Sequence, residues 1–166
     1  EFPQVFEKGG FDVIIGNPPY AYRNSITIEL KKYFKKNYKS IEGNFELYKF
    51  FMEKGINLIK RNGLFSFITS SSFLIQRSFS KLRELILNNT DIVELIPLGP
   101  GVFEDATVDT AIFTFAKSNN NSSIIIKNPS KPSKINTEQP KLISKSRYLK
   151  NDGFVFDTQI TEEMYN

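Results

Sequence analysis

The feature that most restricts how this chain can fold is the stretch at residues 11–20, where an apolar run ends at two consecutive prolines. Its Val-Ile-Ile-Gly segment at residues 13–16 is rich in β-branched side chains and predicts a short buried strand of a parallel sheet. Pro18 and Pro19 lack a backbone N–H and fix φ at about −65°, so neither strand nor helix continues through them. The strand therefore ends in a stiff Asn-Pro-Pro-Tyr tetrapeptide. The carboxyl ends of parallel strands are where open α/β folds bind ligands.

The polar groups of this tetrapeptide indicate a particular chemistry. Asn17 offers an amide oxygen and Pro18 offers a carbonyl held by a rigid backbone, so two acceptors can converge on one amine. Tyr20 adds a flat aromatic face. Such a set suits the exocyclic NH₂ group of a planar ring such as adenine. The simpler alternative is a Pro-Pro turn that only follows a core strand.

The sequence Phe-Asp-Val-Ile-Ile-Gly-Asn-Pro-Pro-Tyr resembles the catalytic motif of amino-methyltransferases that use S-adenosylmethionine. The form with Asn is most similar to that of adenine-N6 DNA methyltransferases, especially the modification half of type IIG restriction–modification enzymes. The resemblance covers roughly residues 11–117. It implies that Asn17 and Pro18 accept hydrogen bonds from the amine of a flipped adenine. The whole motif is implied to be catalytic, Pro19 included, and Tyr20 to stack on the flipped base.

Two further aromatic residues take their predicted roles from the same resemblance. In the family, an aromatic residue in the loop before the seventh strand packs against the flipped base, and Phe103 matches it. An aromatic residue in the helix after the motif touches the adenine of the cofactor in relatives, and Phe51 matches it. The alternatives are a loop residue folded onto the core for Phe103 and a core residue of an apolar helix stripe for Phe51.

The chain contains neither cysteine nor histidine. A zinc site of the ordinary type, a thiol nucleophile and a histidine base are therefore excluded, and we expect no metal site. Cytosine-C5 methyltransferases are excluded as well, because they need a cysteine nucleophile. Methylation of an amine needs no strong base, since the nitrogen lone pair attacks and the proton leaves afterwards. The absence of disulfides is compatible with the cytoplasm, where we expect the protein to be located.

The charge of the chain favours an anionic partner. The formal net charge is +4 and the isoelectric point is about 9.2. The stretch between Tyr20 and Gly43 is rich in lysine, and we expect Lys35 and Lys36 to contact DNA phosphates beside the target base. A solvated lysine face of a helix is the alternative. The sequence has no apolar run of about 18 residues, so we expect no membrane span.

Hydrophobic periodicity predicts alternating helices and strands after the motif. Asn44 is the expected N-cap of a long helix that runs from Phe45 to about Asn62, where Gly63 is expected to stop it. Crossovers of this length between strands imply parallel pairing in right-handed βαβ units. The other predicted helices cover residues 27–38 and a segment that ends at residues 88–89, and the predicted strands cover residues 64–69, 92–98, 110–117 and 123–127.

These elements predict an α/β fold that corresponds to the C-terminal half of a class I, Rossmann-like methyltransferase sheet. Its strands are parallel except for a final antiparallel hairpin, formed by residues 110–117 and 123–127. The sequence divides into residues 1–118, the catalytic half of a methyltransferase domain, and residues 119–166. We expect this second part to be a hairpin strand and a polar linker toward a missing target-recognition domain.

The sequence lacks the residues that would hold most of the cofactor. In this fold a glycine-rich turn and acidic residues precede the catalytic motif, and Glu42, Asp91 and Asp109 fit no ribose-binding context. We therefore expect a piece that needs the remainder of its own parent polypeptide. Alone, it is expected to bind S-adenosylmethionine weakly or not at all and to be inactive. The expected ligands of the parent are S-adenosylmethionine and double-stranded DNA.

Three other functions are open at this point. A protein-glutamine methyltransferase shares the Asn-Pro-Pro-Tyr motif and acts on an amide nitrogen. An RNA methyltransferase would use the same chemistry, and an inert DNA-binding fragment would use none of it. The basic, aromatic segment after Tyr20 and the loop with Phe103 favour nucleic acid over a glutamine peptide.

Overall fold

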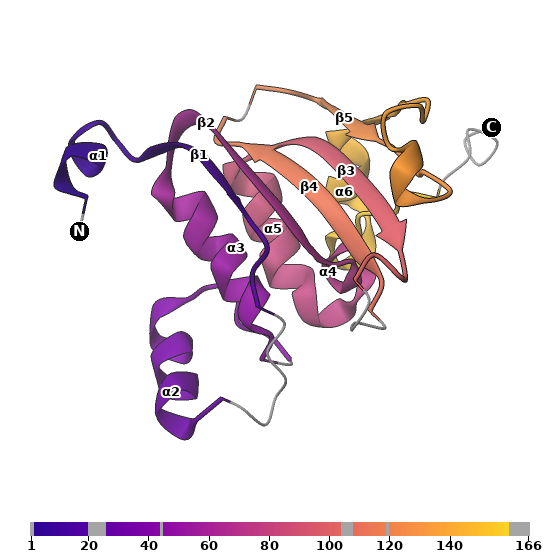
Figure 1. Ribbon diagram of the computed structural model, residues 1–166. Helices are drawn as coiled ribbons and strands as arrows, with labels where there is room; N and C mark the ends of the chain where they lie inside the picture. Colours follow the sequence, from indigo (N-terminus) through magenta and orange to yellow (C-terminus); the bar gives the residue numbers. More distant parts are fainter. Residues whose placement is uncertain (1, 20–25, 44, 104–107, 119, 160–166) are drawn as a thin grey trace.

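A computed structural model describes residues 2–19, 26–43, 45–103, 108–118 and 120–159 of the chain (Figure 1). Its centre is a six-stranded sheet in the order β1-β2-β4-β3-β5-β6. The strands are β1 (Phe11–Gly16), β2 (Ile59–Ser70), β3 (Asp91–Gly99), β4 (Thr110–Ala116), β5 (Ser123–Ile126) and β6 (Lys141–Ser144). The α-helices are α1 (Pro3–Glu7), α2 (Ile28–Asn37), α3 (Leu47–Leu58), α4 (Ser72–Ile75), α5 (Ser80–Asn89) and α6 (Lys145–Lys150). Short 3₁₀ helices are η2 (Arg77–Phe79), η3 (Pro132–Lys134) and η4 (Asp152–Phe154).

The first four strands form the sheet that the sequence predicts. β1 runs parallel to β2, and β4 runs antiparallel between β2 and β3. Ile112 of β4 is paired with Ile68 on one side and with Ile96 on the other. The predicted α/β fold with parallel strands and an antiparallel late strand is confirmed. Because β1, β2 and β3 point the same way, their carboxyl ends form one edge of the sheet, which we call the carboxyl edge.

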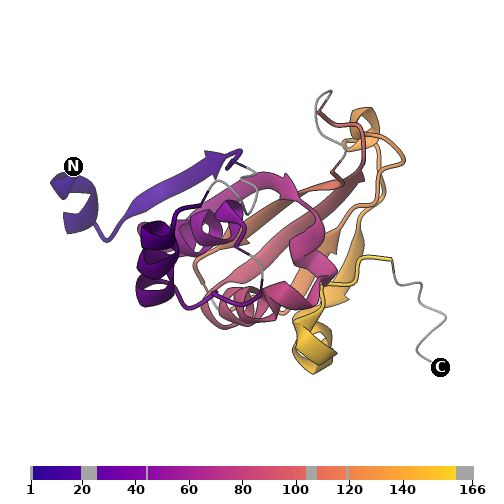
Figure 2. The same cartoon turned by 90° about the horizontal axis from the view of Figure 1, so that it is seen from below.

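The main hydrophobic core lies between one face of the sheet and the helices α3 and α5, which Figure 2 shows together on that side. Phenylalanines from neighbouring strands fill its centre. The rings of Phe113 and Phe115 are stacked with centroids 4.4 Å apart, and Phe65 meets Phe113 edge-on at 5.4 Å. Each such pair adds about 0.5–1.5 kcal/mol beyond the burial of its area. The core thereby fixes the strands whose ends form the carboxyl edge.

The opposite face of the sheet carries exposed apolar side chains. Val13, Ile15 and Leu64 are 59%, 81% and 41% exposed. Val13 is paired with Leu64, and residues two apart in a strand share a face, so all three point to the same side. Sheets with parallel strands in α/β folds bury both faces. This apolar surface is therefore a candidate interface.

The helices agree with the sequence to different degrees. α2 lies within the predicted residues 27–38, and Thr27 caps it, since its hydroxyl accepts a hydrogen bond from the N–H of Leu30 at 3.2 Å. α5 ends at Asn89, as predicted. The predicted N-cap of α3, Asn44, lies outside the described residues.

The prediction that the long helix continues to Asn62 is wrong. α3 ends at Leu58, and β2 begins at the next residue. Residues 60–63 form a bend within β2, where the N–H of Asn62 donates to the carbonyl of Lys117 and the N–H of Lys117 donates to that of Gly63, both at 3.0 Å. These long-range bonds to the segment after β4 replace the last helical turn, a pairing that local periodicity cannot anticipate.

The partner of β5 also differs from the prediction. The segment forms a strand, but it pairs in parallel with β3, aligning Ile125 with Glu94, and not with β4. Both edges of β4 are already occupied by β2 and β3, so the next strand can join only at the outer edge of β3. The antiparallel hairpin at the end of the sheet is instead formed by β5 and β6.

The polar segment after β5 belongs to the same folded unit as the sheet. β6 and α6 follow the loop at residues 127–140, and Tyr148 and Phe156 are fully buried in the main core. The N–H of Phe156 donates to the carbonyl of Leu74 at 2.8 Å. β5, β6, α6 and the segment around Phe156 are therefore folded onto the rest of the protein, whereas most of residues 130–142 are exposed. For residues 119–166 we expected a hairpin strand and a linker. The division at residue 118 and a target-recognition domain after this segment stay predictions.

Candidate active site

The predicted catalytic motif begins at the carboxyl edge. β1 ends at Gly16, which is aligned with Phe67 of β2, and a Cβ atom at Gly16 would lie 3.0 Å from the ring of Phe67. The close approach of strand and ring fixes the start of the motif. Asn17 is exposed, Pro18 is buried and Pro19 is exposed, while Tyr20 lies outside the described residues. The amide of Asn17 thus faces solvent from a buried, rigid support.

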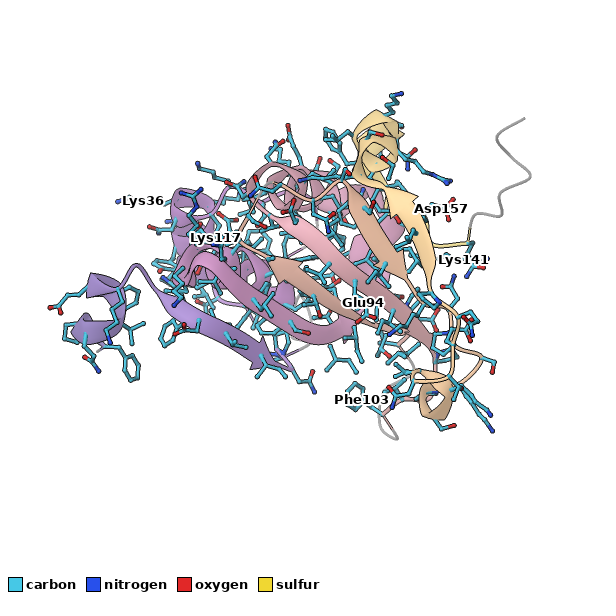
Figure 3. All side chains as sticks on the ribbon, turned by 90° about the horizontal axis from the view of Figure 1, so that it is seen from above. Lys36, Glu94, Phe103, Lys117, Lys141 and Asp157 are labelled. Carbon is cyan, nitrogen blue, oxygen red and sulfur yellow. The ribbon has the colours of Figure 1, made fainter. Side chains whose placement is uncertain are left out.

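The loop that carries Phe103 starts from the same edge. Thr110, the first residue of β4, is paired with Ser70 at the end of β2 and with Gly99 at the end of β3. Phe103 is half-buried and follows Gly99 by four residues. Figure 3 shows its ring beside the end of the sheet toward which β1 points. The structure therefore brings Asn17 and Phe103 to one edge, as their predicted roles require.

The helix with the predicted DNA-binding lysines is attached to the rest of the protein by a small aromatic cluster. Phe34 of α2 is stacked on Phe50 of α3 with ring centroids 4.1 Å apart, and Tyr38 meets Phe50 edge-on at 5.1 Å. Lys35 and Lys36, in the last turn of α2, are exposed. Figure 1 shows α2 at the end of the molecule toward which β1 points, and Figure 3 shows Lys36 well apart from Phe103 in the view from above. A phosphate contact by Lys35 and Lys36 beside the target base stays a prediction.

Phe51 is not a core residue. It is 46% exposed, whereas its neighbour Phe50 is 2% exposed and Met52 is fully buried. The core-facing side of α3 is made of Tyr48, Met52 and Ile56. A ring held at the surface by a buried helix can contact a ligand, so a cofactor contact by Phe51 stays a prediction while the core alternative is excluded.

Two of the acidic residues considered for the cofactor, Glu42 and Asp91, are already hydrogen-bonded within the fold. The carboxylate of Glu42 accepts hydrogen bonds from the hydroxyl of Ser80 at 2.7 Å and the N–H of Lys81 at 3.2 Å, at the start of α5. Burial raises the pKa of Glu42, but these hydrogen bonds outweigh it and leave the pKa below its ordinary value. Glu42 therefore supports a helix start.

Asp91 is the first residue of β3, and its side chain binds the segment before β5. Its carboxylate accepts hydrogen bonds from the Ser118 hydroxyl and from the N–H groups of Asn120 and Asn121, and Lys145 lies 3.5 Å away. Burial raises the pKa of Asp91, but these partners outweigh it and lower the pKa below its ordinary value. Like Glu42, Asp91 has a structural role.

The described residues fit only part of a site for S-adenosylmethionine. They offer the exposed ring of Phe51, but Glu42 and Asp91 are already bonded, and no glycine-rich turn precedes β1 in the sequence. Among the residues that the structure describes, no cluster of three or more acidic side chains could hold a metal ion. Within that same part of the chain, no helix is long and apolar enough to cross a membrane.

Comparison with protein families gives a direct match. The model of the Eco57I restriction-modification methylase family matches residues 1–103, which include the motif at β1 and Phe103. The chain belongs to this family. The resemblance to restriction–modification methyltransferases that the motif predicts is thereby confirmed.

Individual relatives extend the match. The type II restriction enzyme and methyltransferase RM.Eco57I of Escherichia coli is 34% identical over 113 residues, which are 66% of this chain and 11% of that protein. A putative type II restriction enzyme and methyltransferase of Methanocaldococcus jannaschii is 31% identical over 166 residues, which are 98% of this chain and 13% of that protein. The chain thus spans only a small part of these relatives.

Solved structures confirm the fold. A type I restriction-modification methyltransferase subunit from Streptococcus thermophilus gives a TM-score of 0.69 at 16% identity, over 90% of this chain and 37% of that one. The type IIG restriction endonuclease BpuSI gives a TM-score of 0.67 at 17% identity, over 87% of this chain and 20% of that one. At these identities the likeness concerns the fold alone.

We expect the substitution Asp91→Asn to lower the free energy of unfolding by about 1–3 kcal/mol at neutral pH, because the three donors that bond the buried carboxylate lose a charged acceptor. The lowered pKa of Asp91 means that its ionised form stabilises the fold above about pH 4, and that this contribution is lost as the pH falls through the lowered pKa. Denaturant unfolding at several pH values measures this. Asp152→Asn, at an exposed position, is the control. An Asp91→Asn effect that stays constant into the acid range would contradict the proposed role of the charge.

Proposed function

We propose that the protein to which this chain belongs transfers a methyl group from S-adenosylmethionine to the N6 amine of an adenine in double-stranded DNA, within a restriction–modification or phage-defence system. The observation that carries the proposal is the exposed Asn17 and the buried Pro18 at the carboxyl edge of a chain of the Eco57I methylase family. Names of relatives that combine a restriction enzyme with a methyltransferase support the same class of reaction.

In the proposed reaction, the amide oxygen of Asn17 and the carbonyl oxygen of Pro18 accept hydrogen bonds from the two N–H groups of the target amine. This localises the nitrogen lone pair and orients it for in-line attack. Pro19 keeps the backbone stiff, while Tyr20 and Phe103 stack on the base after it leaves the duplex. S-adenosylmethionine, when bound, supplies a methyl group on a sulfonium. The new N–C bond forms as the S–C bond breaks, and the amine then releases its proton to solvent.

We further propose that the chain is a catalytic half that works only with the rest of its parent. Its small share of the relatives' length supports this, as do the exposed Val13 and Ile15 on the outermost strand β1. The remainder would cover that face and supply most of the cofactor site, with Phe51 as this chain's contribution. In this proposal residues 1–118 hold the catalytic motif, and residues 119–166 lead to a target-recognition domain.

The substitution Asn17→Ala tests the catalytic proposal in the parent protein. We expect transfer of a labelled methyl group to adenine in DNA to fall by about a hundredfold or more, because one of two preorganised acceptors is lost. Asn88→Ala, exposed on α5, is the matched control and should leave the rate unchanged. Equal rates for both variants would refute catalysis by this motif. The same assay with RNA and with a glutamine peptide separates the alternative substrates.

The lysines of α2 are tested by the double substitution Lys35→Glu and Lys36→Glu. We expect weaker DNA binding at every sequence and a slope of log affinity against log salt that is smaller by about 0.9 per lost phosphate contact. Lys141→Glu with Lys150→Glu changes the charge by the same amount at exposed positions of β6 and α6. A salt slope that stays at the wild-type value would count against phosphate contact by α2.

The proposal that the chain is incomplete is tested by calorimetric titration of the isolated chain with S-adenosylmethionine. We expect no binding heat at high protein concentration, because no glycine-rich turn precedes β1 and the carboxylates of Glu42 and Asp91 are bonded within the fold. The parent protein under the same conditions is the control and should bind one equivalent. Clear binding of one equivalent to the isolated chain would mean that the described residues hold the cofactor without the rest of the parent.

A further inference from the structure

The segment that joins β2 to α5 is a rigid turn at the carboxyl edge. It covers residues 71–79, with α4 and η2, and we call it the β2–α5 turn. It begins directly after Ser70, and the N–H of Ser71 donates to the carbonyl of Asp109 at 2.8 Å. Figure 1 shows α4 at the end of the sheet where β2 and β3 finish. The turn is therefore tied to the start of β4, close to the loop that carries Phe103.

The register of the sheet relates this turn to the catalytic motif. Gly16 is aligned with Phe67, three residues before Ser70. At about 3.3 Å per residue, the turn, which begins at Ser71, starts about 13 Å farther along the sheet than Gly16 and about 10 Å farther than Asn17. A nucleotide whose base amine reaches Asn17 from the carboxyl edge must have its sugar and phosphate farther out, at the level of the turn.

Two buried cations hold the turn in one conformation. The guanidinium of Arg83 is fully buried and donates to the carbonyls of Phe73 and Gln76, both at 2.8 Å. The ammonium of Lys49, also fully buried, donates to the carbonyl of Ser78 at 2.7 Å. Three carbonyls of the turn are thus bonded by side chains that cannot move without opening the core.

Apolar contacts with the main core and hydrogen bonds from the C-terminal segment fix the same turn on its buried side. Phe73 and Phe79 are fully buried in the main core, and Leu74 is 4% exposed. The carbonyl of Leu74 accepts the N–H of Phe156. Arg83 also donates to the carbonyl of Gly153, at 2.7 and 2.9 Å. The turn therefore has little freedom to adapt to a partner.

The side chains that this support presents to solvent are consecutive. Ile75 is 63% exposed, and Gln76 and Arg77 are exposed as well. The amide nitrogen of Gln76 donates to the hydroxyl of Ser72 at 3.1 Å, which leaves its oxygen directed away from that bond. Because the backbone of the turn is already fixed, binding through Arg77 costs the freedom of its side chain but not that of the loop, and the planar guanidinium donors match the oxygens of a phosphate.

We propose that Arg77 binds a phosphate of the DNA strand next to the flipped nucleotide, with Ile75 against the adjoining sugar. The inference rests on the proposed function, and it adds a phosphate contact from the β2–α5 turn to those expected from the lysines of α2. The contact positions the strand and carries no sequence information. It requires a guanidinium at residue 77 and an intact clamp by Arg83 and Lys49.

The test is DNA binding by the parent protein with Arg77→Ala, measured at several salt concentrations. We expect affinity to fall about 5- to 20-fold at every sequence and the salt slope to decrease by about 0.9, the value for one phosphate. Arg61→Ala is the matched control, because Arg61 is equally exposed but lies in the bend of β2 at the opposite edge of the sheet. It should change neither quantity. Thermal unfolding should be unaltered in both variants.

Equal effects of the two substitutions, or a wild-type salt slope for Arg77→Ala, would overturn the inference. So would a change in assembly with another protein while DNA affinity is unaltered, since the turn would then be a protein interface. The proposed function is tested separately: it fails if the wild-type parent transfers no methyl group to DNA. If the Arg77→Ala parent methylates DNA normally and binds it as tightly as the wild type, only the role of Arg77 is refuted.

Discussion

Two buried cations hold the part of the chain on which the carboxyl edge depends. Removing a charge from water costs several kcal/mol, so Lys49 and Arg83 are kept only because backbone carbonyls surround them. Burial lowers the pKa of Lys49 to about 8, against the raising effect of Glu46 and Glu42, and lowers that of Arg83 to about 10. Both are charged at neutral pH. They bond carbonyls of the β2–α5 turn that regular structure leaves unsatisfied, so an irregular segment can be rigid at the edge of a site.

Much of the fold was predictable because its signals are local. The β-branched run before Pro18 and the strand at residues 110–117 follow from residue type, and the helix at residues 27–38 follows from the spacing of its apolar residues. The errors all concern pairing between distant segments. α3 ends at Leu58 and a strand follows, because the backbone N–H and carbonyl of Lys117 form hydrogen bonds with residues 62 and 63. β5 joins β3 because β4 has no free edge, which only the complete order of the sheet reveals.

Candidate site residues could be predicted from the sequence only where they belong to a known motif. The sequence names Asn17 and Phe103 as candidates, and the sheet brings both to one edge, while their roles stay predictions. The exposure of Phe51 was not predictable, since an apolar residue on a helix normally faces the core. Arg77 gives no signal in the sequence, because a single arginine in a polar segment is common. Its significance depends on Arg83, whose burial is a property of the folded chain.

The position of β4 has a consequence for how the protein forms. β2 and β3 are both complete before Thr110 leaves the ribosome, yet the strand that pairs with both of them, β4, is made only afterwards. The sheet therefore cannot grow strand by strand in the order of synthesis. The early strands, with Phe65 and Leu95 on their inner faces, must wait with open edges until a late segment inserts between them. Direct pairing of β2 with β3 would be a trap that must be undone, so folding is expected to be slow relative to a chain with sequential strands.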